Sequence, residues 1–554
     1  MKSDIEISRE AKVEHINLIA KKAHIDKKYL EYYGNDKAKI SLKLLNDLKD
    51  KKDGHLILVT AITPTPLGEG KSTTSIGLVD GMNLIGKNTI GALREPSLGP
   101  VFGVKGGACG GGYAQVNPMA DINLHFTGDL HAITAANNLI SACIDNHLYF
   151  GNELNINPEA IVWKRCVDLN DRALRKVTVG LDSSKETPRT DGYNITVASE
   201  IMAILCLATS VEDLRHRIEE LIVAYTYDNK VVKVKDLKIS GSVLVLLKDA
   251  IKPNLVQTLE NNPIIIHGGP FANIAHGCNS ILATKLALKL GDYVVTEAGF
   301  GADLGAEKFL DIKCRIAGLK PSAVVLVATL KALKYHGGVD KAIVTEENVD
   351  ALKAGLVNLE KHMDTLDKFG IPYVVALNQY ASDTKAELKA FDDWAKEHGV
   401  EYALSSVFAN GGKGGIDLAN RLIKIIDQPR TPKYMYNLDE PVEDKILKIA
   451  QNVYGAKDIV FTDEAKETLN KIRGTEYEKY FICVAKTPLS LTDNQKIVGA
   501  PKGFTVTIKE IRISAGAKFL VCLTGTIMTM PGLPRVPLAE KIDLDENGDI
   551  INLS

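Results

Sequence analysis

The stretch that decides the fold is residues 56–85, LILVTAITPTPLGEGKSTTSIGLVDGMNLI. Its first seven residues are apolar or β-branched, a length and composition typical of a buried strand. A loop rich in glycine and proline follows, and residues 71–85 are expected to form a helix that ends at residues 86–88. Residues 89–93 begin the next strand. This order of strand, loop, helix and strand predicts a parallel sheet.

The loop between the strand and the helix has a phosphate-binding pattern. Gly70, Lys71 and Ser72 match the end of the motif Gly-x4-Gly-Lys-Ser/Thr, whereas Thr65 stands where its first glycine is expected. Backbone N–H groups at the helix N-terminus would face the phosphates, Lys71 would reach the β and γ oxygens, and Ser72 would ligate Mg²⁺. The alternative is an ordinary turn between a strand and a helix. The residues expected to hold a nucleotide are Thr65, Pro66, Leu67, Gly68, Glu69, Gly70, Lys71, Ser72 and Thr73.

Apolar segments farther along the chain predict more strands and helices. The predicted strands are residues 195–198, 263–266, 293–296, 323–328, 373–377, 504–508 and 519–523. Residues 279–289 and 349–369 are expected to be helices, and the first fifty residues to contain amphipathic helices. We therefore expect an α/β protein with a large P-loop NTPase-like parallel-sheet domain and two smaller α/β or α+β domains. The expected boundaries are 1–345, 346–430 and 431–554.

Composition excludes several classes of protein. The chain has 554 residues, of which 45% are hydrophobic and 25% charged, the average for globular domains. The 67 Lys and Arg residues nearly balance the 69 Asp and Glu residues, so no net field attracts nucleic acid or an anionic membrane. The longest apolar run, residues 201–208, is shorter than the roughly 18 residues that a membrane span needs. The eight cysteines are scattered and are expected to be reduced thiols in a cytoplasmic protein.

Two features follow the second strand of the quoted unit. Arg94 comes at the carboxyl end of that strand, where open α/β sheets bind ligands, and it could neutralise a transferring phosphoryl group. The alternative for Arg94 is a surface salt bridge with Glu95. Seven glycines then fall between Gly99 and Gly112, which lets the main chain approach something small or flat. A flexible linker is the alternative for this run.

At these residues the chain resembles the formate–tetrahydrofolate ligase (10-formyltetrahydrofolate synthetase) family. Residues 103–113 are similar to the first signature of that family, with Cys109 where alanine is usual. Residues 327–338 are similar to the second signature, with Lys331 in place of the expected arginine. The similarity also covers the phosphate loop and residues 94–100, 267–276, 297–303 and 529–534. It therefore extends nearly from end to end.

The resemblance implies a reaction. ATP, formate and tetrahydrofolate would give ADP, phosphate and 10-formyltetrahydrofolate through formyl phosphate. Lys71 and its loop would hold the triphosphate, Arg94 would hold formyl phosphate, and Glu95 would lie beside it as a third catalytic residue. Phe300 and Gly301 would line the same pocket. A transferring phosphoryl group needs such a set of cations and N–H donors.

The resemblance also assigns two aromatic residues to tetrahydrofolate. The pteridine in this family is sandwiched between two rings, and the matching positions here are Tyr380 and Phe408. Both remain aromatic, so stacking should persist, although a smaller ring in place of indole should weaken it. The alternative for either residue is ordinary packing. Residues 181–184 also depart from the glycine-rich pattern of the family, without a functional explanation.

Cofactors and partners follow from the same comparison. We expect Mg²⁺ to bind with ATP, K⁺ or NH₄⁺ to activate the enzyme, and four copies of the chain to form a homotetramer. Small-molecule substrates are the expected partners, with no nucleic acid and no membrane. The alternative function is a diverged P-loop ATPase or binding homologue with weak or no formyl transfer.

Overall fold

A large mixed sheet forms the centre of the molecule. The computed structural model describes residues 2–66, 68–103, 109–525 and 527–553. Within these residues a 12-stranded sheet contains a parallel region in the order β15-β4-β16-β3-β17-β18-β19. The strands of this region are β3 (His55–Ala61), β4 (Thr89–Leu93), β15 (Pro263–Ile266), β16 (Tyr293–Glu297), β17 (Pro321–Ala328), β18 (Tyr373–Asn378) and β19 (Tyr402–Ser405).

Antiparallel strands extend the sheet beyond β15. Strand β14 pairs with β15, β2 and β6, and β2 pairs with β1. These strands bring the N-terminal residues onto the sheet edge. Their bounds are β1 (Leu30–Tyr32), β2 (Ala38–Ile40), β6 (Ala114–Asn117) and β14 (Asn254–Thr258).

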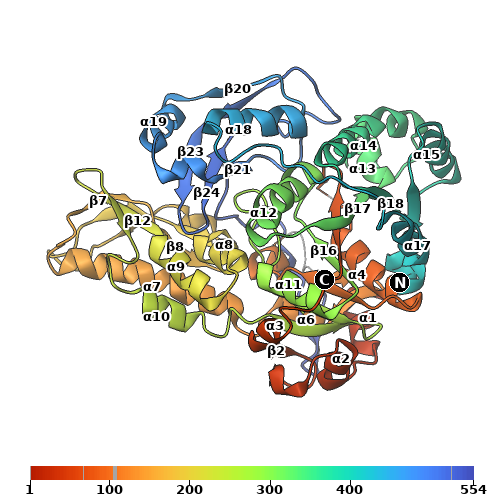
Figure 1. The fold of residues 1–554 in the computed structure, drawn as a ribbon, viewed down its shortest axis with the longest axis horizontal. Coiled ribbons are helices and arrows are strands. Elements are labelled where there is room, and N and C mark those ends of the chain that lie inside the picture. Colours follow the sequence, from red (N-terminus) through yellow and green to blue (C-terminus); the bar gives the residue numbers. More distant parts are fainter. Residues whose placement is uncertain (1, 67, 104–108, 526, 554) are drawn as a thin grey trace.

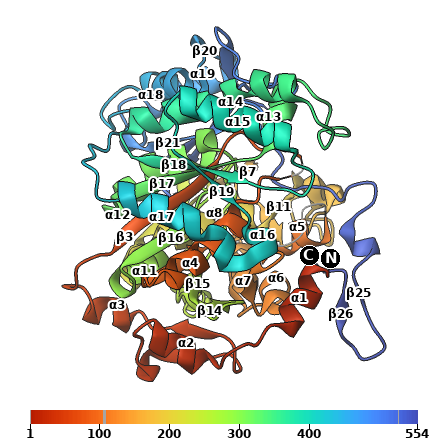
Figure 2. The same ribbon diagram turned by 90° about the vertical axis from the view of Figure 1, so that its right-hand side faces the viewer.

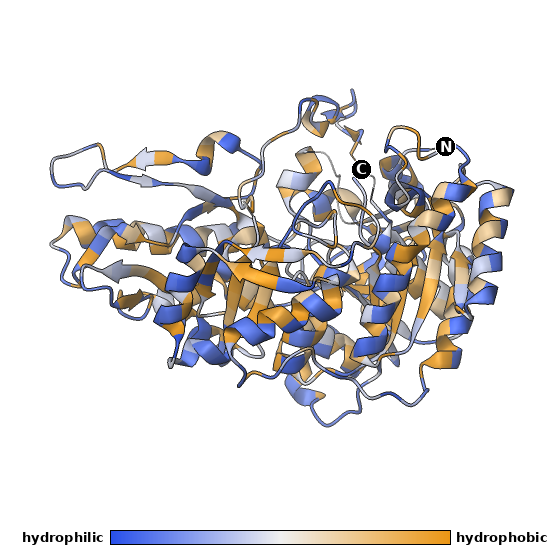
Figure 3. Ribbon diagram, turned by 90° about the horizontal axis from the view of Figure 1, so that it is seen from above, coloured by the Kyte–Doolittle hydropathy of each residue, from blue (hydrophilic) through white to orange (hydrophobic). Residues whose placement is uncertain are grey.

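Strand β3 illustrates why both faces of the sheet are buried. Successive side chains of a strand point to opposite faces, so Leu56 and Leu58 join one hydrophobic core and Ile57 and Val59 join another. Figure 3 shows the apolar strands inside and hydrophilic residues on the outer sides of the helices. The covering helices are α4 (Lys71–Leu84) and α17 (Ile416–Ile425) on one face, and α11 (Ile281–Leu290), α13 (Leu330–His336) and α14 (Val349–Phe369) on the other.

A lobe formed by residues 129–250 stands beside the sheet, at the left of Figure 1. Its hydrophobic core, in which Ile140 and Leu214 are fully buried, continues into the C-terminal region through Phe519 and Leu523. Its principal elements are α7 (Asp129–Tyr149), β7 (Ile156–Ile161), α8 (Glu200–Leu207), α9 (Val211–Glu220), β12 (Ile222–Thr226), β13 (Val231–Lys233) and α10 (Ser240–Leu246).

The C-terminal region forms a separate layer at the top of Figure 1. Strands β21, β24 and β23 form one small sheet, and β20 pairs with β22. The hairpin β25–β26 then returns and projects beside helix α1 (Asp4–Glu10), as Figure 2 shows. The bounds are α18 (Val442–Ile449), β20 (Asp458–Phe461), α19 (Asp463–Ile472), β21 (Phe481–Ala485), β22 (Thr505–Ile508), β23 (Glu510–Ser514), β24 (Phe519–Leu523), β25 (Asp543–Leu544) and β26 (Ile550–Ile551).

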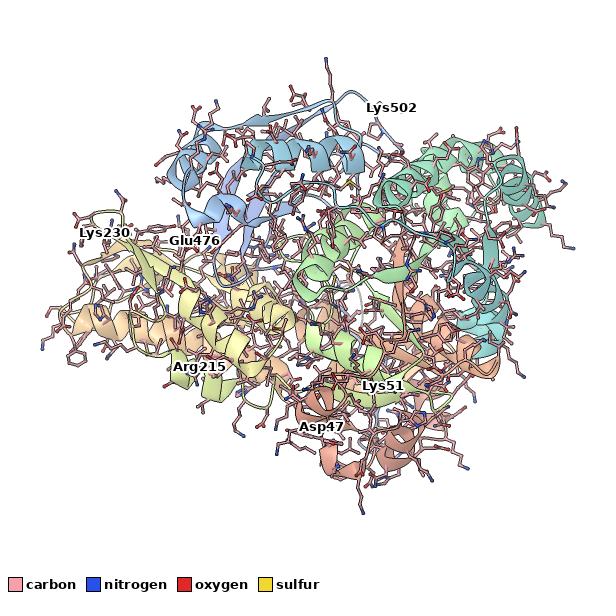
Figure 4. All side chains as sticks on the ribbon, in the orientation of Figure 1. Asp47, Lys51, Arg215, Lys230, Glu476 and Lys502 are labelled. Atoms are coloured by element: carbon pink, nitrogen blue, oxygen red, sulfur yellow. The ribbon has the colours of Figure 1, made fainter. Side chains whose placement is uncertain are left out.

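Charged side chains lie at the rim of each region. Lys230 of the lobe and Lys502 of the C-terminal region are exposed and lie at the outer rim in Figure 4. Glu476 is also exposed but lies where the C-terminal region meets the lobe, 3.9 Å from the ammonium of Lys233. In the described part of the chain, no helix combines the length and apolarity required to cross a membrane. All eight cysteines are free thiols, as expected, and only Cys143 is not buried.

Most predicted elements are present. The strand, helix and strand of the quoted unit correspond to β3, α4 and β4, and the helix at 349–369 is α14. The strand predicted at 195–198 is wrong: Ile195 ends β11 (Tyr193–Ile195), and Thr196–Ala198 form a 3₁₀ turn. The N–H of Ser199 bonds to the carbonyl of Thr196, and the Ser199 side chain caps α8. The strand-like residues Thr196 and Val197 therefore lie in the turn that leads into this helix.

Two further results concern the organisation of the chain. The first fifty residues contain α1, α2 (Ile16–Lys22) and α3 (Lys43–Asp47), but also strands β1 and β2, which their lysine-rich pattern did not indicate.

The expected boundary near residue 345 falls between β17 and β18, which are paired neighbours in one sheet. The sheet is therefore continuous across that position.

Candidate functional site

The candidate site lies at the edge of the sheet where the parallel strands end. The phosphate loop follows β3, Arg94 follows β4, and Glu297 is the last residue of β16. Tyr380 and Phe408 follow the ends of the adjacent strands β18 and β19. Carboxyl ends of parallel strands meet at one edge, so residues far apart in the sequence gather there.

A buried carboxylate, that of Glu69, connects the two ends of the phosphate loop to each other and to the sheet. The side chain of Glu69 accepts hydrogen bonds from the Thr65 N–H at 2.8 Å and from the Thr329 hydroxyl at 2.7 Å. Gly68 and Gly70 adopt φ of +77° and +71°, in the left-handed region that favours glycine. Gly70 immediately precedes α4, so the loop leads directly into the helix N-terminus. This geometry aims backbone N–H groups at any anion bound there.

Glu297 connects this loop to Arg94. Its Oε2 accepts a hydrogen bond from the Ser72 hydroxyl at 2.8 Å, and its Oε1 pairs with the Arg94 guanidinium at 3.1 Å. The carboxylate is only 2% exposed. Among the described residues, the ion pair of Arg94 is therefore with Glu297, and the expected alternative of a salt bridge with Glu95 is wrong.

Glu95 belongs to a neighbouring buried cluster. Burial first, and then the charge of Asp129, raises the pKa of its carboxyl well above the usual value. Lys39 opposes this effect, and it forms an ion pair with Asp129 at 2.7 Å. Glu95 thus follows Arg94 in the chain while its electrostatic environment is set by Asp129 and Lys39.

The loop after β16 places Phe300 and Gly301. Phe300 has φ of +58°, a strained conformation for a residue with a bulky side chain. A side chain at Gly301 would lie 2.6 Å from Oδ1 of Asp303, so only glycine fits. The other oxygen of Asp303 pairs with Lys486 of the C-terminal region at 2.7 Å, with both side chains fully buried.

The two aromatic residues lie in different environments. The Lys331 ammonium lies 3.9 Å from the centroid of the Tyr380 ring, a cation–π contact. Burial, followed by the charges of Glu69 and Asp383, raises the pKa of Tyr380 to about 12. Phe408, in α16 (Val407–Asn410), keeps 38% of its surface exposed.

The described part of the glycine run packs against Phe408. The Tyr113 N–H donates to the Phe408 carbonyl at 2.8 Å, and a side chain at Gly112 would collide with that same carbonyl. The linker interpretation is therefore wrong for residues 109–113. Leu67 of the phosphate loop and residues 104–108 of the glycine run lie outside the described residues.

Three buried carboxylates at this edge have basic partners. Asp129, Glu297 and Asp303 each form an ion pair with a basic residue. In the described part of the chain, no group of three or more His, Cys, Asp and Glu residues could hold a metal ion.

Several anchoring residues were not predicted. Thr329 and Asn378 hold Glu69, Asn378 through a 3.2 Å bond to its carbonyl, and both stand at the carboxyl ends of strands. Asn358 and His362 are polar residues one turn apart on the buried side of α14. Polar residues on the apolar face of an amphipathic helix are the signal that could have identified them.

The fold and these residues define a class of protein: an α/β protein whose large mixed sheet gathers paired charges and aromatic rings at a ligand-binding edge. A model of the formate–tetrahydrofolate ligase family matches residues 2–554, so the chain belongs to this family. Formate–tetrahydrofolate ligases are ATP-dependent ligases, which confirms the expectation of an enzyme of this kind.

Proposed function

We propose that this protein activates formate with ATP and transfers the formyl group to tetrahydrofolate. A formate oxygen attacks the γ-phosphorus, ADP leaves, and formyl phosphate forms. The N10 amine of tetrahydrofolate then attacks the formyl carbon, phosphate leaves, and the nitrogen loses its proton. The products are 10-formyltetrahydrofolate, ADP and phosphate.

The contacts of Glu297 are the observation that carries this proposal. One carboxylate holds both the Ser72 hydroxyl, at the start of α4, and the Arg94 guanidinium. The group that would contact the nucleotide phosphates and the group that would hold the formyl phosphate anion are thus fixed relative to each other. Such fixing lowers the barrier, because the attacking oxygen and the phosphorus must approach to about 3–3.5 Å in line.

Each step has protein groups suited to its charge. Lys71 and the loop N–H groups stabilise the phosphoryl oxygens, and Arg94 neutralises formate and then formyl phosphate. Phe300 and Gly301 line the pocket of this intermediate. Burial and the charge of Asp129 raise the pKa of the Glu95 carboxyl, which weakens its repulsion of a neighbouring anion. Tyr380 and Phe408 stack on the pteridine.

The proposed function also includes a Mg²⁺ ion, an activating monovalent cation, a tetrameric assembly and a cytoplasmic location. Ser72, whose hydroxyl bonds to Glu297 at the start of α4, would be the protein ligand of a Mg²⁺ ion bound with ATP, and the ion would neutralise charge on the phosphates. A monovalent cation, K⁺ or NH₄⁺, activates the reaction. The enzyme is a cytoplasmic homotetramer, a state that light scattering of the purified protein checks.

Oxygen labelling tests the pathway. Formate carrying ¹⁸O in both positions should deliver one labelled oxygen to the released phosphate, because that oxygen bonds to phosphorus in formyl phosphate. Mass spectrometry of the phosphate measures the transfer, with ¹⁸O-labelled water and unlabelled formate as the control. Product formation with unlabelled phosphate would overturn the intermediate. Absence of any 10-formyltetrahydrofolate from ATP, Mg²⁺, K⁺, formate and tetrahydrofolate would overturn the function.

A further inference from the structure

Thr63 lies just beyond the last sheet contact before the phosphate loop. The N–H of Ile62 still bonds to the carbonyl of Val327 of β17, whereas Thr65 already belongs to the loop that Glu69 closes. The backbone between Ile62 and Thr65 makes no further sheet hydrogen bonds among the described residues. Its position therefore depends on hydrogen bonds from side chains.

Three side chains hold Thr63. Its N–H donates to Oδ1 of Asn358 at 3.2 Å, and its carbonyl accepts from Nε2 of His336 at 2.8 Å. Its hydroxyl contacts Nε2 of His362 at 2.9 Å and Nδ2 of Asn358 at 3.1 Å. Thr63, Asn358 and His362 are fully buried, and His336 is 3% exposed. Hydrogen bonds in such a low-dielectric interior are strong and costly to break.

Two of these side chains also hold Gly499 of the C-terminal region. Nδ2 of Asn358 donates to the Gly499 carbonyl at 2.7 Å, and the Gly499 N–H donates to Nδ1 of His336 at 3.2 Å. Asn358 and His336 thus connect Gly499 with Thr63 by two parallel routes. Burial lowers the pKa of His336 to about 4, so its ring is neutral near pH 7, with one donor nitrogen and one acceptor.

We infer that Asn358 and His336 are positioning residues for the nucleotide, and that they make the phosphate loop depend on the C-terminal region through Gly499. This inference rests on the proposed function, because it assigns ATP to that loop. Asn358 contacts Thr63 rather than substrate. Its loss should shift the backbone at Thr63 and at the start of the loop, while the residues that form the contacts with the nucleotide are unchanged in type.

A matched pair of asparagine variants tests the inference. Asn358→Ala and Asn137→Ala each remove a buried amide from a 21-residue helix. Among the described residues, the hydrogen bonds of Asn137 in α7 stay within the lobe and include those to the Lys164 carbonyl and the Ser199 hydroxyl. Calorimetric titration of the full-length enzymes with MgATP, without formate or folate, gives the dissociation constant. We expect Asn358→Ala to raise it about tenfold. Asn137→Ala should leave it unchanged, although both variants lower the melting temperature.

A second pair tests the link to the C-terminal region and covers the case in which Asn358→Ala does not fold. Gly499 and Gly503 both have positive φ, +76° and +74°, so alanine strains each of them alike. A side chain at Gly499 would lie 3.3 Å from the His336 carbonyl, whereas at Gly503 nothing lies within 4 Å. Gly499→Ala should weaken MgATP binding about threefold, with no change for Gly503→Ala.

Different results would contradict the proposed function and the positioning role of Asn358. If the wild type binds no MgATP, the proposed function fails. If the wild type binds MgATP and both Asn358→Ala and Gly499→Ala bind it equally well, the positioning inference fails alone. If Asn358→Ala raises the tetrahydrofolate KM as much as the ATP KM, the positioning inference also fails, because a general loss of structure would raise both.

Discussion

The two sides of the candidate site are built differently. Beside β3, β4 and β16, the side chains of Ser72, Arg94 and Glu297 are already joined by hydrogen bonds, and Glu297 is almost completely buried. Beside β19, Phe408 leaves 38% of its surface exposed. Charges that stabilise a transition state act best when they are fixed in advance, whereas a stacking surface must stay accessible until the ligand covers it. Variants on the charged side should therefore lower kcat, and variants on the aromatic side should raise the tetrahydrofolate KM.

Lys71→Ala should have the largest effect. Loss of the ammonium at the helix N-terminus leaves the developing phosphoryl charge unmatched, and formyl phosphate formation should fall by about 1000-fold or more. Trapping of the acyl phosphate with hydroxylamine measures this step. Lys502→Ala, at an exposed position of the C-terminal region, is the control. Near-normal activity of Lys71→Ala would show that the loop does not hold the phosphates.

Glu297→Gln tests whether pre-formed pairing matters on the charged side. The change keeps the shape of the side chain but leaves the Arg94 charge unpaired in a buried site, so kcat should fall by about 10- to 100-fold. Steady-state kinetics at saturating tetrahydrofolate measure the change. A raised tetrahydrofolate KM at unchanged kcat would contradict the division between the two sides.

Phe408→Ala tests the aromatic side. Loss of a stacking ring should raise the tetrahydrofolate KM about tenfold while the ATP KM stays the same. Phe150→Ala, which removes a phenylalanine that is 75% exposed on the lobe, is the matched control. Equal increases in both KM values would place the stacking surface elsewhere.

Lys331→Ala should have the smallest effect and refine the comparison. The ammonium covers the Tyr380 ring at 3.9 Å, so its removal should loosen that ring and raise the tetrahydrofolate KM about threefold. Lys331→Arg preserves a cation over the ring and should restore the wild-type value. If the arginine variant behaves like the alanine variant, the cation–π contact does not orient Tyr380.

Local patterns allowed much of the fold to be predicted. Seven apolar or β-branched residues identify β3, and the spacing of leucines and other apolar residues identifies α14. Segments whose role depends on distant partners were less accessible. Strands β1 and β2 have only three residues each and form because β14 offers a pairing edge. Residues 196–198 have strand-like composition but precede a serine that caps a helix.

For the candidate site, too, the sequence predicted which residues take part but not which residues they contact. The phosphate loop, Arg94, Phe300 and the two aromatic positions could be named because motifs and family resemblance identify residue types at given positions. Their contacts could not, because Ser72 and Glu297 are 225 residues apart in the chain. The hydrogen bonds that hold Thr63 join it to residues up to 299 positions away, and no local pattern records such a pairing.

The sequence by itself determined the class of protein and the family, and it predicts the position of the phosphate loop, since short-range apolar periodicity and glycine placement are properties of neighbouring residues. Only the tertiary structure decided that Arg94 pairs with Glu297 rather than Glu95, and that Gly499 is connected to Thr63. These choices depend on which strands become neighbours in the sheet and on which buried polar groups must find partners. Both are settled only when the whole chain has folded.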